Sequence, residues 1–204
     1  MTGNSAAQRS AVAIFAIALS FLTLACTRAA FADAESGRQK AQVCVACHGP
    51  GGNSAIPAVP ALAGQPQQFI VTQLFMFREG KRKDAQMAPF AAKLSNADLN
   101  DLAAYFSAQP PAPPSRASTP EIAAAGRRIT EQQNCVACHA RNLMGLQHIP
   151  RLAGQQAEYL RTQLRGFKAS TRFDMDGNMT SAAQGLSDAD IEILADYLSG
   201  LGAP

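Results

Sequence analysis

The feature that most constrains this 204-residue chain is a five-residue segment that occurs twice. Cys-Val-Ala-Cys-His occupies positions 44–48 and again positions 135–139. Cys-x-x-Cys-His is the attachment signal for c-type haem: two thiols form thioether bonds to the porphyrin, and the histidine binds the iron. The chain is therefore predicted to carry two covalently bound haem c groups, each with one iron. The four predicted attachment residues are Cys44, Cys47, Cys135 and Cys138.

The supply of cysteine and histidine disfavours the main alternative, a pair of zinc-binding or redox-active Cys-x-x-Cys motifs. A structural zinc ion takes four protein ligands, usually Cys and His. The chain has five cysteines and three histidines, and outside the two motifs only Cys26 and His148 remain. Once both haems are attached, no cysteine pair is left for an internal disulfide and too few ligands are left for zinc.

The amino-terminal residues predict export. Arg9 precedes an apolar run over residues 11–25, which has the length of a signal-peptide core and is short for a membrane span. Ala30-Phe31-Ala32 resembles a cleavage site, so residues 1–32 are interpreted as a signal peptide and the chain is expected in the periplasm. Bacterial c-type haem is attached outside the cytoplasmic membrane, in agreement with export. A retained amino-terminal anchor and a lipid anchor at Cys26 are the alternatives.

The charge balance does not suggest a nucleic-acid-binding protein. Of the 18 lysines and arginines, Arg9 and Arg28 lie in the predicted signal peptide, which leaves 16 basic residues against 15 acidic ones. Haem propionates would make the loaded protein mildly acidic. The sequence has neither a basic stripe nor a set of aromatic residues arranged for base stacking. Nucleic acid is therefore not expected among its partners.

Both motifs belong to an internal repeat. Pro60-Ala-Leu-Ala-Gly-Gln65 follows the first motif and Pro150-Arg-Leu-Ala-Gly-Gln155 follows the second, and the offset between matched residues stays between 90 and 92. This pattern indicates a domain duplication. We predict a first domain over residues 33–108, a linker over 109–120 and a second domain over 121–204. Four prolines in five positions of the linker favour an extended, semi-rigid spacer.

Hydrophobic periodicity predicts an all-α fold, because no segment alternates long enough to form a strand. One helix leads into each motif, and a second helix follows it; the expected ranges are 34–43 and 121–134, then 67–78 and 156–168. Each domain ends in a helix that begins at an N-cap pair, Ser95 with Asp98 and Ser187 with Asp190. Domains of this size have thin cores, so each is expected to wrap around its haem.

Each iron needs a second axial ligand opposite its histidine, and Met, His, Cys and Tyr are the usual donors. His48 and His139 occupy one side of each iron. Met87 and Met179 fall 39 and 40 residues after these histidines, at equivalent positions of the repeat, and are predicted to be the opposite ligands. Met175 is the alternative to Met179 at the second iron.

A ligating histidine normally donates its other ring N–H to a fixed acceptor. Pro60 and Pro150 fall 12 and 11 residues after the two histidines, and a backbone carbonyl of this loop would supply such an acceptor; a plain turn proline is the alternative. His148 has no counterpart in the first repeat, where Ala58 stands, and is interpreted as a loop or surface histidine.

These motifs together resemble the dihaem cytochrome c4 family, which is built from two class I cytochrome c domains. The resemblance covers essentially the whole chain after the predicted signal peptide. It rests on both haem motifs, the Gly-Pro-Gly-Gly-Asn-Ser segment at 49–54, the paired Leu-Ala-Gly-Gln segments and the late methionines. It implies His/Met ligation at both irons and haems packed near the domain interface. The second repeat departs from the first: residues 140–144 lack the glycines, and Pro89 has no counterpart. Both differences bear on the potential and exposure of the second haem.

The resemblance implies a periplasmic carrier of single electrons between respiratory partners. The donor would be a quinol-oxidising complex or a dehydrogenase, the acceptor a terminal oxidase, and the contacts with such membrane complexes transient. Two filled axial positions leave no substrate site at iron, so an enzyme is not expected and a peroxidase is disfavoured. The alternative is a haem-bearing electron-transfer subunit of a dehydrogenase complex, such as a flavocytochrome sulfide dehydrogenase.

Overall fold

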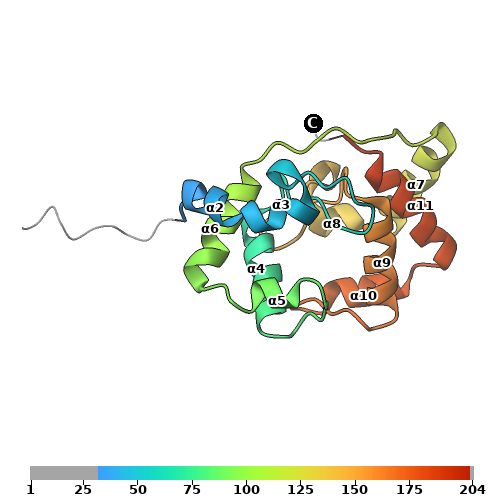
Figure 1. The fold of residues 1–204 in the computed structure, drawn as a ribbon. Helices are drawn as coiled ribbons and strands as arrows, with labels where there is room; N and C mark the ends of the chain where they lie inside the picture. The colour runs from blue at the N-terminus through green and yellow to red at the C-terminus, as the bar shows by residue number, and fades with distance from the viewer. Residues whose placement is uncertain (1–31, 203–204) are drawn as a thin grey trace, which may run out of the picture. The chain divides into compact units, whose positions relative to one another are not determined.

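A computed structural model describes residues 32–202, and their secondary structure is helical (Figure 1). Within this range there is no β-strand, only an isolated β-bridge between Leu146 and Ile149, so the all-α prediction is confirmed. The predicted signal peptide, apart from Ala32, and Cys26 lie outside the described residues. In the described part of the chain, no helix is both long enough and apolar enough to cross a membrane.

The first half of the described chain contains five α-helices and one 3₁₀ turn. In order these are α2 (Ala34–Lys40), α3 (Gln42–His48), η1 (Pro50–Gly52), α4 (Gln67–Arg78), α5 (Ala88–Ala91) and α6 (Asn96–Ser107). The helix predicted over 34–43 is divided at Ala41, and its second part continues through the haem motif instead of ending before it. Helix α4 has the predicted bounds.

The second half repeats this order. Its elements are α7 (Pro120–Gln132), α8 (Cys135–His139), η2 (Arg141–Leu143), α9 (Ala157–Lys168), α10 (Asn178–Gln184) and α11 (Asp188–Ser199). Asn134, which has a left-handed backbone with φ of 52°, separates α7 from α8. Helices α5 and α10 were not predicted, because four and seven residues are too few for a helical period to be recognised.

In each half the first helix packs on the last one, α2 on α6 and α7 on α11 (Figure 1). Glycines allow this close approach: a Cβ on Gly37 would lie 2.0 Å from the Asp101 carbonyl oxygen, and one on Gly126 would lie 2.2 Å from Cγ of Tyr197. Each half has a buried apolar cluster of its own. Ile70, Leu102 and Phe106 belong to the first cluster, and Ile129, Leu160, Ile191, Leu194 and Leu198 to the second.

Both predicted N-cap pairs form capping boxes. At the start of α6 the Asp98 amide donates to Ser95 Oγ (3.2 Å) and the Ser95 amide donates to Asp98 Oδ2 (2.8 Å). At the start of α11, Ser187 and Asp190 exchange the same two bonds at 3.1 and 2.9 Å. Reciprocal bonds of this kind satisfy backbone donors that the first turn of a helix leaves free, so they fix where the last helix of each half begins.

The first capping box carries a pH-dependent part of the stability. Lys40, whose Nζ lies 2.7 Å from Asp98 Oδ1, and the Ser95 side chain lower the pKa of Asp98 to about 2. A carboxylate with a depressed pKa stabilises the fold above its unfolded pKa and stops doing so as the pH falls through the folded value. Because the pair is partly exposed, Asp98→Asn should cost about 1–2 kcal/mol at neutral pH.

The measurement is urea unfolding of Asp98→Asn and the parent protein at about pH 7 and about pH 2.5, where the difference in the free energy of unfolding should be clearly smaller. Asp190→Asn is the matched control, since the pKa of Asp190 is lowered first by its bonds with Ser187, and its pH dependence should be smaller. If Asp98→Asn lowers the free energy of unfolding equally at both pH values, the ionised Asp98 carboxylate is not the source of the pH dependence.

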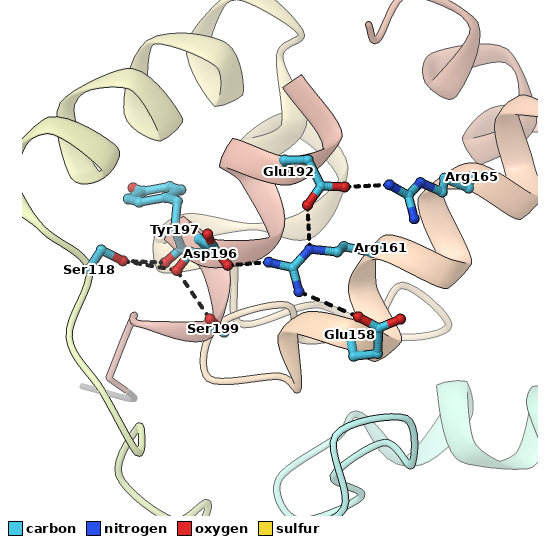
Figure 2. Close-up of polar contacts among 8 residues, drawn as sticks. All are labelled: Ser118, Glu158, Arg161, Arg165, Glu192, Asp196, Tyr197 and Ser199. Carbon is cyan, nitrogen blue, oxygen red and sulfur yellow. Dashed lines mark hydrogen bonds and ion pairs between the residues drawn. The ribbon is translucent and has the colours of Figure 1, made fainter. Parts of the chain in front are cut away.

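Helices α9 and α11 are joined by a cluster of ion pairs around Arg161 (Figure 2). Arg161 Nε lies 2.7 Å from Glu192 Oε2, and its other guanidinium nitrogens contact Glu158 and Asp196. Ser118, near the end of the linker, donates its hydroxyl to the Asp196 carbonyl oxygen at 2.9 Å. The linker is therefore tied to the same helix that the arginine holds.

The segment between α6 and α7 forms no helix over residues 109–119, all of which the structure describes. Its beginning is held by Asn53, whose side chain donates to the Pro110 carbonyl oxygen (3.1 Å) and accepts from the Ala112 amide (2.7 Å). Its end is held by Ser118. Both ends of the proline-rich segment are thus anchored, one on each half. Figure 1 shows the course of this segment between α6 and α7.

Candidate haem sites

The two Cys-x-x-Cys-His motifs lie on equivalent short helices, α3 and α8. Residues three apart share a helix face, so both thiols of a motif lie on one side. Cys44 and Cys135 are half-buried, and Cys47 and Cys138 are exposed. The motif histidines end these helices and are buried, with 6% of His48 and 4% of His139 exposed.

Each buried histidine is held by one ring nitrogen. His48 Nδ1 lies 2.8 Å from the Pro60 carbonyl oxygen, and His139 Nδ1 lies 2.9 Å from the Pro150 carbonyl oxygen. The predicted acceptors are confirmed. Because a carbonyl oxygen can only accept, Nδ1 carries the hydrogen and Nε2 keeps its lone pair. Burial lowers the pKa of both histidines, partly opposed by these hydrogen bonds, which favours the neutral ring. Two thiols and a neutral histidine with a free Nε2 fit a covalent haem.

The methionine of the first half stands at a helix start. Met87 is the N-cap of α5 and is half-buried. Asp84 orders the turn before it, because its Oδ1 accepts from the amides of Gln86 and Met87, both at 2.9 Å. The backbone position of Met87 is therefore fixed by local hydrogen bonds.

The corresponding turn of the second half is built differently. Met179 lies in the first turn of α10, and its amide donates to Asp174 Oδ2 at 2.9 Å. Asp176, which aligns with Asp84 in sequence, accepts only from the Asn178 amide among backbone donors of this turn, at 3.3 Å. Met179 is half-buried, whereas Met175 is 61% exposed and lines a shallow surface pocket with residues of α4 and α6 in the first half. These positions favour Met179 over Met175.

The turn after the second motif keeps the backbone of the first without its glycines. Gly49, Gly51 and Gly52 have φ of 75°, 61° and 80°; Ala140, Asn142 and Leu143 have φ of 62°, 57° and 58°. Left-handed backbone is unfavourable for residues with a Cβ. The sequence difference between the repeats therefore leaves the turn geometry unchanged and makes it strained in the second half.

Ala140→Gly should relieve part of this strain. With φ of 62° and ψ of 178°, Ala140 occupies a region that is almost confined to glycine. We expect the substitution to stabilise the protein by about 1 kcal/mol, the relief exceeding the entropic cost of glycine. Thermal and urea unfolding of the holoprotein would measure it. The control is Ala124→Gly on an exposed face of α7, which should destabilise the protein by about 0.5–1 kcal/mol. If both substitutions lower the free energy of unfolding, the Ala140 backbone is not strained.

His148 lies in a loop, with 41% of its side chain exposed, and its Nε2 is 3.6 Å from Asp176 Oδ2. This placement agrees with its interpretation as a loop histidine.

The two halves are joined by hydrogen bonds that occur in exchanged pairs. The Gln65 side chain donates to the Arg151 carbonyl oxygen and accepts from the Arg151 amide, both at 2.9 Å. In the reverse direction, the Gln155 side chain donates to the Ala61 carbonyl oxygen (2.9 Å) and accepts from the Ala61 amide (2.8 Å). These glutamines end the two Leu-Ala-Gly-Gln segments, so the motif that marks the repeat in the sequence also joins the two halves.

Two backbone bonds follow the same exchange: the Phe69 amide donates to the Gln147 carbonyl oxygen (3.1 Å), and the Tyr159 amide to that of Pro57 (3.2 Å). Each bond has a counterpart at an offset of 90 residues, because Gln65 matches Gln155, Phe69 matches Tyr159, and the partners 151 and 147 match 61 and 57. The contact between the halves therefore has approximate two-fold symmetry.

Arg151 breaks that symmetry, because its counterpart in the first half is Ala61. Its side chain is 2% exposed, and its guanidinium donates to the carbonyl oxygens of Ala63 (2.9 Å) and Ala153. Burial lowers the pKa of Arg151 to about 10, so it stays charged at neutral pH. A buried positive charge thus lies between carbonyl oxygens of the two halves, those of Ala63 and Ala153.

A matched pair of arginines, Arg82 and Arg172, also lies at the contact between the halves. The guanidinium of Arg82 lies 4.5 Å from the ring centre of Phe77, and that of Arg172 lies 4.4 Å from that of Phe167. Arg82 also donates to the Tyr159 hydroxyl in the other half at 3.0 Å. Burial is the main cause that lowers the pKa of Arg172 to about 10. The only sequence signal for this pair is that both arginines stand at matched positions of the repeat.

Two histidine sites of equal construction on a duplicated helical fold define a dihaem c-type cytochrome, an electron-transfer protein. Models of known families match both halves: "Cytochrome c" over residues 123–202 and "Cytochrome C oxidase, cbb3-type, subunit III" over residues 32–106. Cytochrome c4 of Thiocapsa roseopersicina is 39% identical over 181 residues, which are 83% of this chain and 93% of the relative.

A crystal structure of reduced recombinant cytochrome c4 from Pseudomonas stutzeri superposes with a TM-score of 0.77 at 36% identity, covering 83% of this chain and 98% of that one. The "thiosulfate dehydrogenase electron acceptor" of Thiomonas intermedia is 33% identical over 171 residues, 78% of this chain and 79% of the relative. The chain belongs to the cytochrome c4 family. The expected family, fold and two haem c groups are thereby confirmed, and the protein is an electron-transfer cytochrome and not an enzyme.

Proposed function

We propose that this dihaem cytochrome works in the periplasm and carries single electrons between respiratory partners. Its donor would be a quinol-oxidising complex or a dehydrogenase, and its acceptor a terminal oxidase, each contacted briefly at a membrane complex. The observation that carries the proposal is the pair of matched His and Met sets in a member of an electron-transfer family. With both axial positions filled, electrons would pass through the haem edge and no substrate would bind iron. Contacts between redox partners of this kind are small and transient.

The residues proposed to bind haem form two equivalent sets, one in each half. Cys44 and Cys47 would attach the first haem and Cys135 and Cys138 the second. His48 with Met87, and His139 with Met179, would be the axial ligands. Bound haem supplies reversible one-electron chemistry at iron, and a methionine ligand raises its potential. The Pro60 and Pro150 carbonyls hold Nδ1 of each histidine ring, which would leave Nε2 free to bind iron.

Domain limits and location are parts of the same proposal. Residues 33–108 and 121–204 would each hold one haem, joined by the linker over 109–120; the separate apolar clusters of the two halves support this division. Residues 1–32 would direct export to the periplasm and be removed, with lipidation at Cys26 as the alternative. The apolar run before Cys26 and the site of c-type haem attachment support export.

An optical redox titration of the purified holoprotein, repeated under carbon monoxide, tests the ligation and the carrier role. Two high-potential waves, a Met–Fe(III) charge-transfer band and no carbon monoxide binding are expected. Carbon monoxide binding at either haem, or a wave at low potential, would mean an open or differently ligated iron and would contradict the proposal.

A second candidate is a haem-bearing subunit of a dehydrogenase complex. The similarity to a thiosulfate dehydrogenase electron acceptor favours this class of partner, and a flavocytochrome sulfide dehydrogenase is a further example. Purification of the native protein decides between the two. A stoichiometric dehydrogenase that stays bound through size-exclusion chromatography would favour the subunit, whereas a free dihaem protein would favour the carrier.

A further inference from the structure

Each haem-motif histidine is connected, through a single peptide unit, to a glutamine of the opposite half. We propose that Gln155 and Gln65 are positioning residues that tune the reduction potential of the haem in the other half. The inference rests on the proposed ligation of iron by His48 and His139. It goes further, because it assigns a role in electron transfer to two residues that touch neither the thiols nor the histidines.

In the first half the connecting unit is the peptide bond between Pro60 and Ala61. Its carbonyl oxygen accepts from His48 Nδ1 at 2.8 Å, and its N–H donates to Gln155 Oε1, also at 2.8 Å. The two groups belong to one planar, resonance-stabilised amide. A continuous chain therefore runs from Gln155 through this amide to the ring of His48.

The second half has the same chain with the roles exchanged. The peptide bond between Pro150 and Arg151 accepts from His139 Nδ1 at 2.9 Å and donates to Gln65 Oε1 at 2.9 Å. The arrangement thus occurs twice, each time with the glutamine and the histidine in different halves.

Such a chain acts on the metal ligand because hydrogen bonds in series polarise one another, by about 10–30% per bond in condensed phases. An amide whose N–H is bonded is a stronger acceptor at its carbonyl oxygen. A stronger acceptor on Nδ1–H raises the basicity of the histidine as a ligand, which favours Fe(III) over Fe(II). Each glutamine therefore lowers the potential of the haem in the opposite half.

Burial makes this effect specific to the glutamines. Gln65 is 2% exposed and Gln155 is 4% exposed. An isosteric apolar side chain would leave the peptide N–H unpaired, in a place that water reaches poorly. The second bond of each glutamine, from Nε2 to the carbonyl oxygen of Ala61 or Arg151, fixes the amide orientation that presents Oε1 to the N–H.

The test is the potential of each haem in Gln155→Met and Gln65→Met, resolved by following the haem methyl NMR signals through a redox titration of the holoprotein. For Gln155→Met we expect the equilibrium constant for reducing the first haem to rise about two- to fivefold, which is about 20–40 mV at about 59 mV per tenfold change. The reduction potential of the second haem should not change. Gln65→Met should shift the second haem and leave the first unchanged.

Gln156→Met is the matched control. Gln156 also crosses between the halves, because its Nε2 donates to the Ser54 carbonyl oxygen, but it does not touch either connecting peptide through its side chain. Its loss should move neither potential. Gln155→Glu is the conservative variant: a buried carboxylic acid can still accept from the Ala61 amide, so its first-haem potential should be closer to that of the parent than the potential of Gln155→Met.

Three results would overturn the inference: equal shifts of both haems, a shift confined to the haem in the glutamine's own half, or unchanged potentials. Hydrogen exchange in the unmodified holoprotein tests it without any variant. The amides of Ala61 and Arg151 should exchange slowly, and fast exchange of either amide would contradict the proposed series of hydrogen bonds. If the Met–Fe(III) band is present while the potentials fail to respond, the inference fails and the proposed ligation stands; if the band is absent, the ligation itself fails.

Discussion

Met87→Ala is expected to open the first haem iron to carbon monoxide and to lower its reduction potential. The thioether donor favours Fe(II), and its removal leaves water or an empty position opposite His48. Axial ligands set haem potentials over a wide range, so we expect a fall on the order of 0.1 V or more. Carbon monoxide difference spectra and a potentiometric titration would measure both effects, and an unchanged spectrum would refute Met87 as a ligand.

The second half provides a matched comparison for this prediction. Met179→Ala should open the second iron in the same way, whereas Met175→Ala removes an exposed side chain and should leave the spectrum unchanged. If instead Met175→Ala opens the iron and Met179→Ala does not, the ligand at the second haem is Met175.

Removal of both thiols of the second motif is expected to leave a protein with one covalent haem. Cys135→Ala combined with Cys138→Ala takes away both thioether bonds of that site, while Cys44 and Cys47 still attach the first haem. Mass spectrometry of the denatured protein should show the mass of one haem, not two. Retention of two covalent haems would contradict the attachment residues.

The same double variant should unfold its second half at a lower temperature. Cys135 packs against the apolar cluster of that half, and a domain of this size buries little apolar surface without its haem. Differential scanning calorimetry of the double variant should therefore show two separate unfolding transitions, one for each half. The reverse variant, Cys44→Ala with Cys47→Ala, should destabilise the first half instead, and identical melting of both variants and the parent would argue against a haem-dependent core.

Features that depend on nearby residues were predictable from the sequence. Ser95 with Asp98, and Ser187 with Asp190, mark the starts of α6 and α11 because a capping box is formed within four residues. The carbonyl acceptors for His48 and His139 were expected from the spacing of Pro60 and Pro150. Helices α5 and α10 were not predicted, since their few residues show no period, although they contain or adjoin both proposed methionine ligands.

Features that depend on contact between the halves could not be predicted. No local pattern indicates that Gln65 bonds to residue 151 and not to a residue of its own half, because the exchange is a property of the folded pair. The same holds for Arg151, whose buried guanidinium finds its carbonyl partners in both halves. The left-handed backbone of Ala140 could not be predicted either, because an alanine gives no sign of the turn that glycines mark in the first half.

The linker, anchored by Asn53 and Ser118, also determines how the two halves respond to dilution. Short linkers give joined modules an effective concentration in the millimolar range. A contact made by a few crossed hydrogen bonds therefore needs only a modest intrinsic affinity to stay closed, however dilute the protein becomes. Both ends of the linker are hydrogen-bonded to the half they adjoin, so fewer open arrangements compete with the closed one than a flexible chain would allow. Cleavage between Pro114 and Ser118 would turn that contact into an ordinary bimolecular equilibrium, subject to mass action.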